Sequence, residues 1–335
     1  MGALASSIGT WIQKVAQAWL IVTTTGSRSA FFLGLDSFLG ELPLLLLTMI
    51  GGVFTDRRDR RHMILMSQIV QMLVALVLAV LIYTSHIRIV QVLVLSCIVG
   101  CVRAFGGPAY QALVPTLVGK EHLPNAIALN SIQFNLAQVI GPFVAGAALA
   151  SLGMAACFGL NGISFLFVIA AILTLRDVHV PPMATESMVD QLRSGLRFVR
   201  RSPNLITVMV LGFLGAFFGA PLLTFLPVIS RDVFHRDVVF FTQLMEFSGA
   251  GAFTGAVIVA WLGKNKQMGR TLLTLLTVFG TVIVGFGLSR VLMELSLVPG
   301  PEAYGFMAAT ILIDLWLLYV FFTRRIAARR SPAPP

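Results

Sequence analysis

Six ionisable side chains lie inside long apolar stretches of this chain, where a charge is costly unless it finds a partner or water. They are Lys14, Asp36, Glu41, Arg103, Glu246 and Asp314. An acid in such a place can take up and release a proton as its surroundings change, and a neighbouring base can hold it ionised. The chemistry that these residue types favour is therefore proton exchange linked to movement of another molecule.

Depth along the apolar stretches suggests which of these groups meet. Lys14 and Glu41 each lie about 11 residues, or about 16 Å, from the outer end of their stretch, near the midplane of a bilayer. Asp314 reaches the same depth, whereas Asp36 and Glu246 come out shallower, at about 9 and 12 Å. We therefore predict a Lys14–Glu41 pair, either a static bridge or a proton-linked switch. Glu41 is the first candidate for a proton site, Asp36 the second and Asp314 the third.

A second cluster is the basic loop Gly51–Arg61 between two apolar stretches. The small residues Gly51 and Gly52 would let helices approach closely. Asp56 beside guanidinium groups could form ion pairs that break when parts of a bundle rock. Anchoring of the loop on one side of the membrane is the alternative reading of the same charges. The candidate gating residues of this loop are Gly52, Asp56, Arg57, Arg60 and Arg61.

Two further sites lie within apolar stretches. Arg103 is about 10 Å from the nearer end of its stretch, so it could reach the interface, pair with Asp56 or line a cavity. Gly141, Pro142 and Gly146 would allow close packing and a local bend. Ordinary helix packing accounts for these three residues equally well.

Composition places the whole chain in a membrane. Hydrophobic residues make up 57% of the 335 residues and charged residues 11%, against roughly a quarter in soluble domains. The net charge of +10 is carried by short loops, which favours topology-setting charge beside anionic lipid over nucleic-acid binding. Cys97, Cys101 and Cys157 lack metal-ligand spacing and are expected to pack as free thiols. With no nucleotide-binding loop and no nucleophile–base set, we expect neither an enzyme nor a cofactor.

About ten membrane spans are predicted. The first carries a polar face of Gln13, Lys14 and Gln17, so it is either short or faced by other helices. The predicted spans are roughly 3–25, 30–54, 62–84, 88–110, 126–150, 153–175, 203–229, 238–262, 269–292 and 303–323.

Loop charge predicts the orientation. Most of the 24 lysine and arginine residues fall in one alternating set of loops, which should therefore be cytoplasmic together with both termini. The opposite set holds only Arg28, Arg88, Arg231, Arg236 and Arg290.

The longest interruption divides the chain into two halves. We expect an N-terminal lobe over 1–175, a cytoplasmic linker with an amphipathic helix over 176–202, a partial C-terminal lobe over 203–323 and a tail over 324–335. Two blocks of spans joined by a basic link are typical of secondary transporters.

Five segments, in this order, carry a family resemblance. They are Gly52–Arg61, of the form G-x-L-A-D-R-x-G-R-R; Ala104–Pro115 at the end of span 4; Asn125–Gly146 along span 5; Gly195–Arg201 in the central loop; and Leu226–Pro227 in span 7. Together they resemble the major facilitator superfamily, in its branch of bacterial drug-efflux and enterobactin-exporter-like proteins, over about residues 5 to 262.

The resemblance implies a fold and a set of roles. It implies an all-α, polytopic, two-lobed helical bundle in which the Asp56 cluster stabilises the outward-facing state. Gly141–Gly146 would be the antiporter motif of span 5, which favours export. Gln138 stands where this branch often has arginine. The family has twelve spans and ten are placed here, so a fragment, an internally deleted form and a divergent member are all open.

We therefore expect a secondary active transporter in the cytoplasmic (inner) membrane. It would be a proton-coupled monomer that exports small amphipathic molecules, drug-like or siderophore-like. Uptake or lipid translocation by the same fold, and a truncated scaffold that does not transport, are the alternatives.

Overall fold

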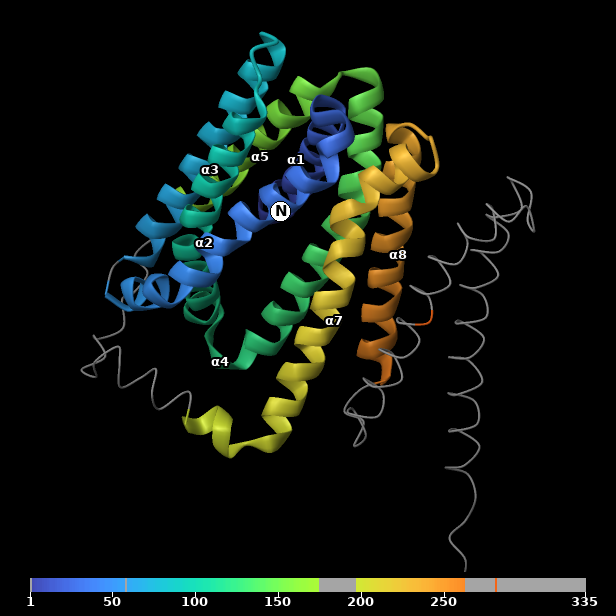
Figure 1. The fold of residues 1–335 in the computed structure, drawn as a ribbon. Coiled ribbons are helices and arrows are strands. Elements are labelled where there is room, and N and C mark those ends of the chain that lie inside the picture. The colour runs from blue at the N-terminus through green and yellow to red at the C-terminus, as the bar shows by residue number, and fades with distance from the viewer. Residues whose placement is uncertain (1, 58, 175–196, 263–280, 282–335) are drawn as a thin grey trace, which may run out of the picture. The chain divides into compact units, whose positions relative to one another are not determined.

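The computed structural model describes residues 2–57, 59–174, 197–262 and 281 (Figure 1). Every regular element in this part of the chain is helical, which confirms the all-α prediction. The elements are α1 (Gly2–Thr25), η1 (Gly26–Arg28), α2 (Ser29–Arg57), α3 (Arg60–Tyr83), α4 (Ile89–Ser151), α5 (Met154–Leu173), α7 (Pro203–Val228), η2 (Ile229–Val233) and α8 (Val238–Leu262).

Helix bounds agree with the predicted spans to within a few residues, except in α4. This element turns back on itself in Figure 1 and contains two stretches long and apolar enough to cross a membrane, Ile89–Val118 and Glu121–Ser151. The two predicted spans in this region stopped short because the intervening residues, although helical, are more polar. The predicted spans 269–292 and 303–323, the latter with Asp314, lie outside the described residues.

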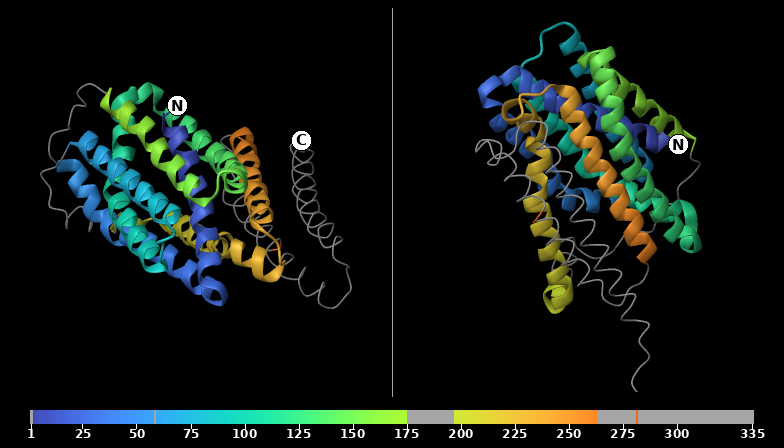
Figure 2. Two further views of the ribbon diagram at one scale, coloured as in Figure 1. Left: turned by 90° about the horizontal axis from the view of Figure 1, so that it is seen from above. Right: turned by 90° about the vertical axis from the view of Figure 1, so that its right-hand side faces the viewer.

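One compact unit contains α1 to α5, the part of α7 from Ala216 onward, and α8. Residues Asn204–Gly215 of α7 belong to a second unit. Within the first unit α8 lies beside the second half of α4, as the right-hand view of Figure 2 shows. The predicted lobe boundaries stay a prediction.

Apolar side chains both fill the core of this unit and cover much of its surface. α1 is central and buries Val15, Ala16 and Ile21 almost completely. On α3, Leu73 and Val77 are about half exposed, at 52% and 46%, one helical turn apart. An exposed apolar stripe of this kind suits contact with lipid tails, which confirms the multi-pass membrane reading.

Glycine sets the distance between α2 and α4. A β-carbon added to Gly100 would collide with the backbone of Gly40, and one added to Gly51 would collide with the carbonyl of Ala104. Close approach at Gly51 was predicted and is confirmed. Gly52 faces open space, so the same prediction for Gly52 is wrong. The helix turns the two glycines about 100° apart, and only one can face α4.

Gly100→Ala is predicted to destabilise the bundle, because the new methyl group meets backbone atoms that cannot move aside. Overpacking of this kind costs about 1–3 kcal/mol. The measurement is thermal unfolding in detergent, followed by fluorescence-detected size exclusion. Gly107→Ala on the same helix is the control, since Gly107 has nothing within 4 Å of the added atom. Equal melting temperatures for the two variants would contradict the close packing.

Candidate functional site

The polar face of α1 is explained by its neighbours. Gln17 donates through Nε2 to Asp36 Oδ2 on α2 at 2.8 Å and to Ser96 Oγ on α4 at 2.9 Å. Ser96 in turn donates to Asp36 Oδ1 at 2.6 Å. Three helices are therefore joined at one carboxylate. A lipid environment offers no such partners, so these bonds fix how the three helices are rotated.

A second polar contact joins α1 to α5. Asn161 Nδ2 donates to Gln13 Oε1 at 2.6 Å, and Ser164 Oγ donates to the Asn161 carbonyl at 2.7 Å. Both α5 side chains are buried. Gly9 lies against them, because an added β-carbon would be 2.8 Å from Asn161 Oδ1. Span 1 was predicted to be either short or faced by other helices. The second alternative is confirmed, since α1 has 24 residues and its polar side chains contact neighbouring helices.

The predicted direct pair of Lys14 with Glu41 is wrong. Glu41 Oε1 lies 3.6 Å from Arg103 Nη1 on α4. Lys14 Nζ lies 4.9 Å from the centre of the Trp11 ring, a cation–π distance, and interacts with the charges of both Glu41 and Arg103 at longer range. Matching depth alone could not tell which charge on α4 would compete for the carboxylate.

Arg103 was expected to pair with Asp56, to line a cavity or to reach the interface. Its partner here is Glu41, and the two side chains are 40% and 61% exposed. Lys14 is exposed as well. Two cations and one carboxylate from α1, α2 and α4 therefore lie near one another with exposed side chains, and together they could bind a polar or charged group.

The other predicted acids have different surroundings. Asp36 is tied to α1 and α4 by the bonds above, so it is more enclosed by partners than its shallow depth suggested. Glu246 on α8 is half-buried, and it makes no hydrogen bond or ion pair with the part of the chain that the structure describes. Asp314 lies outside that part.

The two arginines at the start of α3 donate to backbone carbonyls of α4 and α5. Arg60 is 9% exposed and donates through Nη1 to the Ala112 carbonyl at 3.1 Å. Arg61 donates to the Ile172 and Leu173 carbonyls, at 3.1 and 2.8 Å, at the end of α5. Cations favour C-terminal carbonyls such as those of α5, whereas Ala112 lies in the interior of α4. These bonds give Arg60 and Arg61 a structural role in packing α3 against α4 and α5, and both the gating and the topology-anchoring interpretations stay predictions.

Asp56 and Arg57 close α2, but their side chains lie outside what the structure describes. Asp59 begins α3 as its N-cap, where its carboxylate accepts from the Arg61 backbone N–H at 2.9 Å. The gating role of Asp56 stays a prediction.

The small residues of span 5 contact two different helices. Gly141 lies against Trp11 of α1, and a β-carbon added to Gly146 would be 2.7 Å from Thr242 Oγ1 of α8. Pro142 is fully buried beside them. Farther along the same interface, a β-carbon on Gly249 of α8 would be 2.7 Å from the Gln138 carbonyl. Close packing at Gly141 and Gly146 is confirmed.

Three functional candidates were missed at the sequence level: Ser96, Asn161 and Arg231. Ser96 and Asn161 are polar residues within apolar stretches, and that was the signal in the sequence. The structure shows that their partners are Asp36 and Gln13. Arg231 counted only as loop charge. Among the described residues, no group of three or more His, Cys, Asp or Glu side chains could hold a metal ion. All three cysteines are free; Cys157 is buried and the other two are half-buried.

Comparison with known proteins agrees with this bundle. The family of transmembrane secretion effectors, part of the major facilitator superfamily, matches residues 1–300. The chain belongs to this family. It is therefore a multi-pass membrane protein of a transporter superfamily.

Individual relatives show the same kinship. The staphyloferrin A transporter of Staphylococcus aureus is 24% identical over 286 residues, which are 83% of this chain and 70% of that protein. Macrolide efflux protein A of Streptococcus pyogenes is 24% identical over 287 residues, 83% of this chain and 68% of that protein. The enterobactin exporter of Salmonella typhimurium is 30% identical over 216 residues, 63% of this chain and 49% of that exporter.

Ser96→Ala is predicted to lower the melting temperature by several degrees, because Asp36 loses a donor inside the bundle. An unsatisfied buried acceptor costs about 1–3 kcal/mol. Ser131→Ala, in the second half of α4, is the matched control: its exposed hydroxyl bonds only to the Ile127 carbonyl of its own helix. Thermal unfolding in detergent would refute the structural role of Ser96 if both variants melted with the parent protein.

Proposed function

We propose that this protein is a secondary transporter that exports small amphipathic molecules from the cytoplasm by alternating access. The observation that carries the proposal is the cluster of Lys14, Glu41 and Arg103. Charged side chains on membrane helices almost always face the bundle interior or a water-filled cavity, and here charges from three helices lie near one another. The three relatives named above are a macrolide efflux protein, a siderophore transporter and a siderophore exporter, which supports the proposal.

The charges of this cluster favour particular substrates. With Glu41 ionised, two cations face one carboxylate, so the cluster is net positive. A substrate that carries an anionic group or several hydrogen-bond acceptors would bind there more favourably than a cation. Siderophore-like compounds fit this requirement better than cationic drugs.

Proton coupling would act through the same carboxylate. When Glu41 takes up a proton, Arg103 loses its partner and the repulsion between Arg103 and Lys14 increases. That repulsion would favour separation of the helices that carry the two cations, so proton entry would be linked to the conformational change that returns the empty site. We propose Glu41 as the coupling acid, with Asp36 as the second candidate.

The membrane orientation is part of the proposal. We infer an inner-membrane protein with both termini in the cytoplasm and Asp56 at the cytoplasmic ends of α2 and α3. There Asp56 would stabilise the outward-facing state, while Arg60 and Arg61 hold α4 and α5.

Transport is tested in inverted membrane vesicles with a macrolide, enterobactin and staphyloferrin A as probes. We expect gradient-dependent accumulation of at least one probe, which a protonophore abolishes. Glu41→Gln should lower the accumulation rate by about tenfold or more, equivalent to about 1.4 kcal/mol of lost coupling. Binding of the probe to purified protein should persist.

Glu121→Gln is the matched control, because Glu121 is an exposed acid at the turn of α4. Normal pumping by Glu41→Gln would place the coupling acid elsewhere. Accumulation in right-side-out vesicles alone would favour uptake, and no movement of any probe in either orientation would favour the scaffold alternative.

Orientation is tested by cysteine labelling in intact cells, with Cys97, Cys101 and Cys157 replaced by alanine. A membrane-impermeant maleimide should label Arg88→Cys, because this exposed position precedes α4 on the predicted outer side. It should leave Arg197→Cys unlabelled until the cells are permeabilised. The opposite pattern would reverse the topology.

A further inference from the structure

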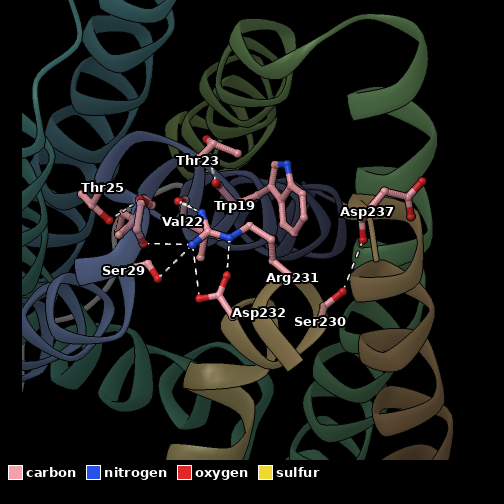
Figure 3. A network of polar contacts seen from close by, with 11 residues as sticks. Trp19, Val22, Thr23, Thr25, Ser29, Ser230, Arg231, Asp232 and Asp237 are labelled. Atoms are coloured by element: carbon pink, nitrogen blue, oxygen red, sulfur yellow. Dashed lines mark hydrogen bonds and ion pairs between the residues drawn. The ribbon is translucent and has the colours of Figure 1, made fainter. Parts of the chain in front are cut away.

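One arginine ties the connection between α7 and α8 to the turn between α1 and α2 (Figure 3). Arg231 lies in η2 and donates through Nη1 to the Val22 carbonyl and through Nη2 to the Gly26 carbonyl at 2.9 Å. Nη2 also lies 3.5 Å from Ser29 Oγ at the start of α2. A single guanidinium therefore contacts the end of α1, the turn and the start of α2.

The Val22 carbonyl lies in the last turn of α1, and the Gly26 carbonyl accepts from the Ser29 backbone N–H as well as from Arg231. The last four carbonyls of an α-helix have no intrahelical partner, and the last turn of α1 contains no basic residue. The chain leaves α1 through Gly26 at φ +56°, a conformation that suits glycine. Arg231 supplies from a distant part of the sequence the cation that a helix C-terminus favours.

The neighbouring acid makes this contact reversible. Asp232 Oδ1 lies 2.6 Å from Arg231 Nε, and its Oδ2 accepts from Nη2 at 3.2 Å. The two side chains are 26% and 41% exposed. Because Asp232 is adjacent in the sequence, it stays with Arg231 wherever η2 moves. The guanidinium can thus leave the carbonyls of α1 without becoming an unpaired charge.

Contacts next to Arg231 close the same end of the unit. The rings of Trp19 on α1 and Phe241 on α8 are stacked at 6.0 Å with an angle of 13° between their planes. Ser29 and Ser230 on the two connected segments are 1% and 0% exposed. The α1–α2 turn and the α7–α8 connection are therefore in contact in this conformation.

We propose that Arg231 is a latch that holds this end of the bundle closed. It carries its counter-charge on Asp232 and releases the carbonyls of Val22 and Gly26 when the bundle opens. This inference rests on the proposed alternating-access cycle, in which segments from the two halves separate on one side. The latch needs no ligand and acts on the equilibrium between the two conformations.

The test uses Ser29→Cys as a reporter in the full chain purified in detergent, with the three native cysteines replaced by alanine. Ser29 is protected here, so a maleimide should react slowly. Arg231→Met removes both carbonyl contacts and should raise the labelling rate by about tenfold or more. Arg231→Lys keeps the charge but loses the forked geometry, and its rate should be intermediate.

Arg236→Met is the matched control, because Arg236 is an exposed cation of the same connection and should leave the rate unchanged. A parental rate in Arg231→Met, or an equal rise in Arg236→Met, would overturn the latch. If Arg231→Met does not yield folded protein, an unchanged rate in Arg231→Lys would overturn it instead. The assay measures opening without transport, so it can fail or succeed independently of the export test.

Discussion

Polar side chains inside a bilayer have to find partners on other helices, and this constraint determines the arrangement of α1. Gln17 bonds to α2 and α4 through Asp36 and Ser96, and Gln13 bonds to Asn161 on α5. The helix cannot rotate without breaking these bonds, since lipid offers no replacement. Lys14, between the two glutamines in sequence, is thereby held near Glu41 and Arg103. The candidate transport site therefore depends on hydrogen bonds that are not themselves part of it.

Arginine side chains bind backbone carbonyls of other helices at two places in the unit, but with different consequences. Arg60 and Arg61 are the first two residues of α3. They bind carbonyls of α4 and α5, and all three helices belong to the predicted N-terminal half. Arg231 comes from the other half and binds α1. The first kind of contact can persist through a transport cycle in which the halves move as bodies. The second kind has to break, and Arg231 already forms an ion pair with the adjacent Asp232, which can keep its charge paired when the carbonyls are released.

Hydropathy and loop charge were enough to predict the helical class, most helix bounds and the central place of charged residues in α1, α2 and α4. They could not predict which charges pair, because depth fixes a position along a helix axis but not the rotation about it. This is why Glu41 was matched with Lys14 rather than Arg103, and why Gly52 was grouped with Gly51. Arg231 was missed since its partners are backbone carbonyls, which leave no trace in side-chain patterns.

The two glycine contacts between α4 and α8 determine how closely these helices approach each other. Gly146 faces Thr242 and Gly249 faces Gln138, so the numbers rise in opposite directions and the helices are antiparallel. The contacts lie about 12 Å apart along the axis. At Gly249 the two backbones approach each other directly, whereas at Gly146 the Thr242 side chain fits against the glycine. A larger residue at either glycine would push the two helices apart, so the spacing between α4 and α8 depends on both positions.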